Sequence, residues 1–184
     1  MVGASDMKSL EEMMSAYQKG SIEDFELLFA NLAPPLRRYL YGFVKDASLA
    51  EDLVQETFMQ IHRSRHTYIP PRPVKPWVFA IARHTALIEL RRRRRRAPEV
   101  LAIEDLPELP VEPAAHGEEG REILDRALRD IPGIAQEILV MHHVIGFSFR
   151  EIAAALGMTE GAAKVRAHRA LRALRQSIEE GENA

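Results

Sequence analysis

The chain has 184 residues, of which 46% are hydrophobic, which is enough for one or two domains with a buried core. It has no cysteine, so disulfide bonds, cysteine-ligated zinc and thiol catalysis are excluded, and a reducing compartment is expected. No apolar run approaches the ~20 residues of a membrane span, and the first 20 residues lack the features of a signal peptide. We therefore expect a cytoplasmic protein with no membrane insertion.

The net charge of −2 hides a strong segregation of charge along the chain. Residues 64–96 carry 10 basic side chains and one acidic one, whereas residues 97–119 carry 7 acidic side chains and none that is basic. A second basic patch lies between residues 160 and 175, where five Lys or Arg side chains face one Glu. Two basic patches separated by an acidic connector indicate a polyanionic partner that is contacted at two places.

Apolar residues recur every three or four positions and no period-two runs occur, so the patterning predicts an all-α protein. A first helical stretch, bent near Pro34-Pro35, is marked by Phe25, Leu28, Phe29, Leu32, Leu36, Leu40 and Phe43. A second helix is predicted to open with a capping box of Ser48 and Glu51, and its buried face comprises Leu49, Leu53, Val54, Thr57 and Ile61. The proline-rich stretch TYIPPRPVKP interrupts the helices, and a third helix after Pro76 faces inward with Val78, Ile81, Ala82, Thr85 and Ile88.

The segment after the six arginines is predicted to be a flexible acidic linker. Residues 97–118 contain four prolines and no helical period, and they are longer than a normal loop within a domain. A second, smaller domain then begins with a helix over roughly 119–130, and a further helix starts at Pro132 and ends at Gly146.

The stretch SFREIAAALGMTEGAAKVRAHRALRALRQ has the pattern of a helix-turn-helix. Ser148 and Glu151 form a capping box, Gly157 permits the turn, and Thr159 caps the second helix. The outer face of that helix shows cationic and hydrogen-bonding side chains of the kind that read the DNA major groove. The alternative is a basic, solvated helix of an ordinary helical bundle.

Together these motifs resemble bacterial RNA polymerase sigma factors of the extracytoplasmic-function (ECF, group 4) class, the type with region 2 and region 4 alone. The resemblance covers about residues 11–175, and its most specific pieces are AEDLVQETF at 50–58, PWVFAIARHTA at 76–86 and FSFREIAAALGMTEGAAKVRAHRALRAL at 147–174. It implies two small helical domains, with a region 2-like domain at 1–96, the acidic Pro-rich linker at 97–118 and a region 4-like helix-turn-helix domain at 119–184. It also implies transcription initiation at specific promoters, with no catalytic activity and no cofactor.

The resemblance assigns a partner to each surface. Region 2 would bind the β′ clamp helices of core RNA polymerase through Asp52, Gln55, Glu56 and Phe58, and region 4 would approach the β flap. The acidic linker would thread the polymerase cleft, and an anti-sigma factor is expected as a further partner. Promoter −10 DNA would contact Tyr68, Lys75, Trp77, Arg83, His84, Arg91, Arg92, Arg93 and Arg94. The −35 element would contact Lys164, Val165, Arg166, His168, Arg169 and Arg172.

Several of these residues have a plainer interpretation. Trp77 and Phe79 fit a hydrophobic core, and the arginine run fits a solvated helix end that the helix dipole favours or a nuclear-localisation signal. The adjacent histidines His142 and His143 point about 100° apart on a helix, so we expect no metal site there.

Some positions depart from the family pattern. The proline-rich loop replaces a Gly- or Ser-bearing one, and His84 stands where Asn is common. Ala162 and Val165 lack hydroxyl groups that are usual at their positions, which predicts a different −35 sequence preference. Two other functions stay open: a sigma mimic that sequesters an anti-sigma factor, and a simple helix-turn-helix regulator.

Overall fold

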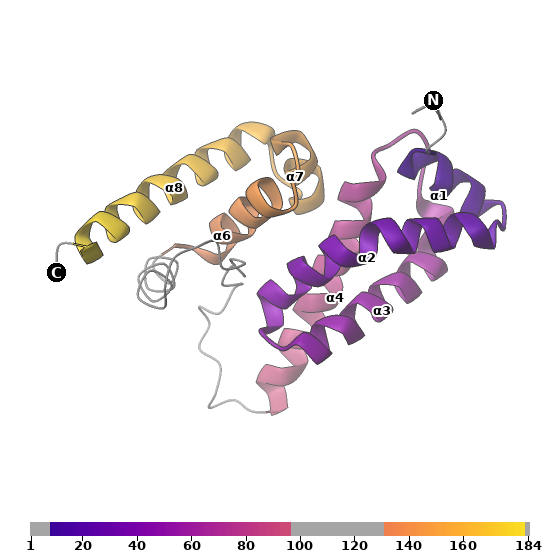
Figure 1. Cartoon of the computed structure of the whole chain (residues 1–184), viewed down its shortest axis with the longest axis horizontal. Coiled ribbons are helices and arrows are strands. Elements are labelled where there is room, and N and C mark those ends of the chain that lie inside the picture. The colour runs from indigo at the N-terminus through magenta and orange to yellow at the C-terminus, as the bar shows by residue number, and fades with distance from the viewer. Residues whose placement is uncertain (1–7, 97–130, 183–184) are drawn as a thin grey trace, which may run out of the picture.

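The computed structural model describes residues 8–96 and 131–182 of the chain (Figure 1). Every regular element in these two ranges is a helix, which confirms the predicted all-α fold. The predicted linker at 97–118 and the predicted helix at 119–130 lie outside the described residues.

The N-terminal domain is a bundle of four helices. They are α1 (Leu10–Gln18), α2 (Ile22–Val44), α3 (Ala47–Ser64) and α4 (Val74–Arg96), with a short 3-10 turn at Arg65–Thr67. Helix α2 packs along α3 and α4, and α1 lies across one end of the bundle (Figure 1). α2 continues through Pro34 and Pro35 as one helix. Leu32, Leu36 and Leu40 are at most 2% exposed and line the core, as their spacing predicts.

The predicted start of α3 is wrong. The helix begins at Ala47, and its N-cap is Asp46, whose Oδ1 accepts a hydrogen bond from the Leu49 backbone N–H at 3.1 Å. Ser48 therefore lies within the first turn and not at the cap. Asp46 is as good an N-cap as Ser, and the resulting helix buries the predicted residues Leu53, Val54 and Thr57.

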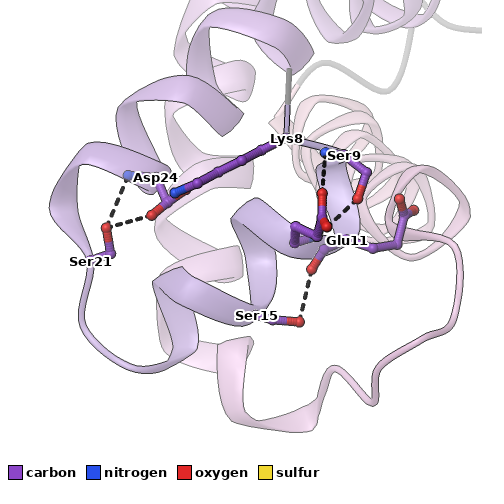
Figure 2. A network of polar contacts seen from close by, with 7 residues as sticks. Lys8, Ser9, Glu11, Ser15, Ser21 and Asp24 are labelled. Carbon is purple, nitrogen blue, oxygen red and sulfur yellow. Dashed lines mark hydrogen bonds and ion pairs between the residues drawn. The ribbon is translucent and has the colours of Figure 1, made fainter. Parts of the chain in front are cut away.

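A polar network fixes α1 to the start of α2 (Figure 2). Ser9 and Glu12 form a capping box at the start of α1. The Lys8 Nζ lies 2.8 Å from the Asp24 Oδ1, and the Ser21 hydroxyl donates to Asp24 Oδ2 at 2.7 Å. The hydrogen bond from Lys8 lowers the pKa of Asp24, so this carboxylate stays ionised and holds the chain just before α1 against α2.

The C-terminal domain contains α6 (Gly133–Leu139), a π-helical turn (Val140–Val144), α7 (Phe149–Leu156) and α8 (Glu160–Glu182). The capping box of Ser148 and Glu151 is confirmed, and the Thr159 hydroxyl accepts from the Ala162 N–H at 3.2 Å. Gly157 has φ +66°, the left-handed conformation that the predicted turn requires. The small side chains of Ala163, Ala167 and Ala170 are buried, which lets α8 lie close to its neighbours.

The two domains touch through α4 and α7. Phe79 of α4 and Phe147, just before α7, are each 1% exposed, and their ring centroids are 4.7 Å apart at 64°. Tyr39 of α2 extends this aromatic group, with its ring centroid 5.1 Å from that of Phe79. Phe79 is thus a core residue, as its plainer interpretation suggested, but the core that it joins lies between domains.

Candidate nucleic-acid and protein interfaces

One exposed face of α3 carries Asp52, Gln55 and Glu56. Their side chains point away from the buried face of Leu53, Val54 and Thr57, as the helical period requires. The Gln60 amide donates to the Glu56 Oε1 at 2.6 Å, and an Arg63 nitrogen lies 3.9 Å from the same oxygen. This gives an acidic, amide-bearing surface that suits an arginine-rich partner.

Phe58 lies in the core and not on this face. It is 5% exposed, and its ring packs 6.1 Å from that of Phe25 and 4.6 Å from that of Phe29. Phe58 lies four residues after the buried Val54 and so shares its inward face, where it packs against α2 and supports the acidic face from behind. The neighbouring Met59, which the sequence analysis did not select, is 49% exposed beside this face.

Tyr68, expected to contact a base, is also buried. It is 3% exposed, and its hydroxyl donates to the Arg72 carbonyl oxygen at 2.5 Å. Trp77 is half-buried and its ring lies 5.5 Å from that of Tyr68. Tyr68 therefore braces the proline-rich loop and Trp77, and its own ring face is not available to a nucleotide.

Two residues of α1, missed by the sequence analysis, hold both ends of this loop. The Gln18 side-chain amide donates to the carbonyl oxygens of Arg65 at 2.6 Å and Tyr68 at 2.8 Å. The Glu11 Oε1 accepts the backbone N–H of Val74 at 2.9 Å, which satisfies a free donor at the start of α4. Local sequence patterns carry no signal for contacts across 47 to 63 residues.

An open groove of ≈ 940 Å³ runs between α3 and α4. Its walls combine apolar, acidic and aromatic side chains: Leu49, Asp52, Leu53, Glu56, Gln60, Ser64, Trp77, Ala80, Ile81, His84, Thr85, Ile88, Glu89 and Arg92. The groove joins the acidic face of α3 to the predicted −10 face of α4. Ile88, predicted to face inward, is 50% exposed on its rim.

The arginine run continues α4 to its end, and carboxylates already hold part of it. The Arg92 guanidinium donates to both oxygens of Glu89, at 2.7 and 3.0 Å. Arg93 lies 3.4 Å from Glu89 and 3.8 Å from Asp46. Arg91 and Arg92 are exposed, and the side chain of Arg94 lies outside the described part of the chain. The hydrogen bond from Arg92 lowers the pKa of Glu89, so the pair stays charged near neutral pH.

Arg83 contacts the other domain. Its Nε donates to both carboxylate oxygens of Glu137 in α6, at 3.0 and 3.2 Å, and the Tyr39 hydroxyl donates to Glu137 Oε1 at 2.5 Å. Glu137 is 0% exposed, and burial raises its pKa against the lowering effect of Arg83 and Tyr39. Burial, together with this carboxylate, raises the pKa of Tyr39 well above its ordinary value, so Tyr39 stays protonated and donates. Neither Tyr39 nor Glu137 was among the functional residues predicted from the sequence.

His84 is exposed beside Arg83 on α4, whereas Lys75 is half-buried near the start of the helix. The structure thus brings His84, Ile88 and Arg92 together on the groove, and it places Arg83 at the domain contact.

Helix α8 presents the predicted −35 residues on its exposed face. Lys164, Val165, Arg166, His168, Arg169 and Arg172 are all exposed. Lys164 pairs with Glu160 at 2.6 Å, and an Arg166 nitrogen lies 3.7 Å from the Met158 sulfur. The opposite face is buried through Ala163 and Ala167, so the orientation of the exposed face follows from packing.

Comparison with known proteins identifies this arrangement. A family model described as sigma-70 region 2 matches residues 28–96, and one described as sigma-70 region 4 matches residues 121–174. The RNA polymerase sigma factor CarQ of Myxococcus xanthus is 36% identical over 170 residues, covering 91% of this chain and 96% of CarQ. The ECF sigma factor SigX of Bacillus subtilis is 31% identical over 168 residues, covering 85% and 84%. The chain belongs to the ECF sigma factors.

Solved structures agree with this assignment. The sigma factor RpoE of Bartonella quintana, in complex with the anti-sigma factor NepR, is 25% identical with a TM-score of 0.68, and covers 86% of this chain and 98% of that one. The sigma factor CnrH, in complex with the cytosolic domain of CnrY, has a TM-score of 0.69 at 19% identity, over 94% of this chain and 99% of that one, and so shares the fold. None of the described helices of the present sigma factor is long and apolar enough to span a membrane.

Proposed function

We propose that this sigma factor binds core RNA polymerase through the acidic face of α3, reads the −10 element with the groove and arginine end of α4, and reads the −35 element with α8. The observation that carries the proposal is the coexistence of three exposed, chemically distinct faces on one chain. An acidic face, an aromatic and basic groove, and a basic recognition helix fit one protein partner and two DNA elements. A simple helix-turn-helix regulator needs the last of these alone.

The acidic face supplies the contact with the β′ clamp helices. Asp52, Gln55 and Glu56 are exposed, and the buried Phe58 keeps their helix in place. Complementary charges across such a surface favour encounter and orientation, and reversed charges cost several kcal/mol.

For DNA, the residues at the groove have the right chemistry for a melted strand. At the groove, Trp77 is a half-buried aromatic side chain, and His84 and Arg92 supply hydrogen bonds and positive charge, to which the exposed Arg91 of the same helix adds. Aromatic walls and adjacent cations bind single strands without reading every base. We assign Tyr68 to bracing the loop that bears this site.

The sigma factor has no reaction of its own in this proposal, since polymerase performs the chemistry. We place it in the cytoplasm, with its polymerase and promoter DNA, and we infer an anti-sigma partner that covers the same faces.

Run-off transcription with purified core enzyme tests the function. The promoters are DNA fragments selected from a library for binding to core enzyme that carries this sigma factor. We expect transcripts that require both the sigma factor and intact −10 and −35 elements. A sigma mimic or a simple regulator yields no such transcripts, and their absence with active core enzyme would reject the proposal.

The double charge reversal Asp52→Lys and Glu56→Lys tests the polymerase contact. We expect affinity for core enzyme to fall by several kcal/mol because like charges face each other, while the helix survives since Lys is a good helix former. Glu26→Lys, an exposed charge reversal on α2, is the matched control. Pull-down of core enzyme measures the effect, and wild-type affinity in the folded double variant would remove the assignment.

A further inference from the structure

The carboxylate of Glu137 sits in an anion-binding site formed by the other domain. Three hydrogen bonds reach its two oxygens, two from Arg83 Nε and one from the Tyr39 hydroxyl. Tyr39 is 2% exposed and Glu137 is 0% exposed, so the pair is withdrawn from water at the contact between domains. Buried carboxylates normally persist where they are paired and hydrogen-bonded, as this one is.

The donors of this site suit a phosphate as well as they suit a carboxylate. A guanidinium carries five N–H donors in a fork that matches both kinds of oxyanion. The structure engages one of those donors, Nε, with Glu137, and the Arg83 side chain is 28% exposed. Arg83 also lies one position from His84, on the helix that ends in the arginine run.

The contact between domains is incompatible with the span of a promoter. The −10 and −35 elements are about 25 base pairs apart, which is about 85 Å at about 3.4 Å per base pair. Helices α4 and α8 have 23 residues each, or about 35 Å at 1.5 Å per residue, and Phe79 touches Phe147 between them. A chain in which α4 meets α7 cannot place its two reading surfaces on both elements, so the domains must separate at the promoter.

We propose that Arg83 and Tyr39 form a binding site for a DNA phosphodiester when the two domains are apart. When the domains are in contact, Glu137 occupies this site, so domain contact and strand binding by region 2 exclude each other. The inference rests on the proposed function, because it assigns the −10 strand as the ligand that takes over the site. Its consequence is that the free sigma factor binds DNA weakly until separation of the domains releases Arg83.

The decisive variant is Glu137→Gln, which keeps the shape of the side chain but removes its charge. Because the chain has no cysteine, A30C and A154C give unique positions for a donor and acceptor dye on exposed sites of α2 and α7. The probe is a short, fluorescent single-stranded DNA of mixed sequence. We expect Glu137→Gln to lower energy transfer and to bind the strand at least about tenfold more tightly, since the apparent Kd is the intrinsic Kd divided by the fraction of molecules that can bind.

Two controls separate a release of Arg83 from a general change of charge. Glu51→Gln removes a partly exposed carboxylate 3.4 Å from Arg37 within one domain, and it should change neither signal. Adding Arg83→Ala to the Glu137→Gln variant should cancel the gain in strand affinity while the domains stay apart.

A measurement on the wild-type protein needs no mutation at the contact. Adding the strand to the dye-labelled chain should lower energy transfer, because binding and opening are linked reciprocally. Unchanged energy transfer in Glu137→Gln, or opening without tighter binding, would overturn the proposal. Run-off transcription is scored separately, so wild-type transcription combined with either of these results leaves the proposed function standing and rejects the shared anion site.

Discussion

The two basic surfaces of this sigma factor differ in what surrounds their cations. On α4, Arg83, Arg92 and Arg93 each lie beside a carboxylate. Two of these carboxylates, Glu137 and Asp46, come from distant parts of the chain. On α8, the described part of the chain shows a carboxylate partner for Lys164, and none at ion-pair distance from Arg169 or Arg172. The positive charge of the α4 surface is therefore partly neutralised by carboxylates of the same chain, whereas, among the described residues, that of Arg169 and Arg172 on α8 is not.

The helix dipole adds to this difference. The arginine run lies at the C-terminal end of α4, where cations are favoured even without DNA. The predicted −35 residues of α8 lie mostly in its N-terminal half, where the helix dipole gives cations no such benefit. The helix dipole therefore accounts for part of the positive charge on α4 but not for that on α8, as expected if the α8 cations serve the proposed DNA contact.

The largest expected effect in this comparison distinguishes base recognition from phosphate contact on α8. Arg169→Ala should cost about 1–3 kcal/mol and relax preference at one −35 position, because Arg169 can reach guanine O6 and N7. Arg172→Ala, further along the helix, should weaken all sequences alike and lower the salt slope by about one. Titrations of −35 variants at two salt concentrations measure both. Equal weakening of every variant by both substitutions would show that α8 does not read sequence.

Loss of a helix cap should affect one surface and spare the other. Ser148→Ala removes the hydroxyl that accepts from the Glu151 N–H at 3.2 Å, and such losses cost about 1 kcal/mol. We expect a lower unfolding free energy and weaker −35 binding, because α7 positions α8. Binding of a −10 single strand should be unchanged. Ser9→Ala removes the matching cap of α1 and is the reverse control, because it should weaken binding of the single strand and leave −35 binding unchanged.

The smallest effect compares one carboxylate from each surface. Glu89→Gln frees Arg92 and removes one of the two carboxylates beside Arg93, and it should tighten single-strand binding about two- to fivefold, the range of a partly exposed ion pair. Glu160→Gln frees Lys164 on α8 and should change −35 binding less, because both partners are about half exposed. Fluorescence anisotropy at fixed salt measures both, and a larger effect for Glu160→Gln would reverse the comparison.

The pH dependence of the α4 surface follows from the same pair. Arg92 lowers the pKa of Glu89 below its ordinary value of 4.5. The stability that this pair contributes is present above that ordinary value and is lost as pH falls through the lowered pKa. Strand binding should therefore show no step from Glu89 between about pH 5 and 8, which a titration of the Glu89→Gln variant beside the wild type can check.

Sequence patterns predicted the features that depend on near neighbours. The capping box of Ser148 and Glu151, the left-handed Gly157 and the buried stripes of α2 and α3 all follow from spacing of three or four residues. The same reasoning placed the start of α3 at Ser48, because two adequate caps, Asp46 and Ser48, lie two positions apart.

The features that were missed depend on residues far apart in the chain. Tyr68 and Phe58 have side chains that fit a surface or a core equally well, and packing against Trp77 and Phe29 decides for the core. Arg83 and Glu137 are 54 residues apart in different domains, so no periodicity connects them. The domain boundaries at 96, 97–118 and 119 stay predictions, since they fall at or within the residues that the structure does not describe.

The contacts of α1 have a practical consequence for dissecting the molecule. Gln18 and Glu11 tie the proline-rich loop and the first turn of α4 to the N-terminal helix. A fragment trimmed to the matched family region, residues 28–96, would discard both side chains and the whole of α1. The proline-rich loop would lose both hydrogen bonds from the Gln18 amide, and the Val74 N–H would lose its acceptor, the Glu11 carboxylate. Fragments meant to report on strand recognition should therefore begin at or before Lys8, where the ion pair to Asp24 secures the first helix.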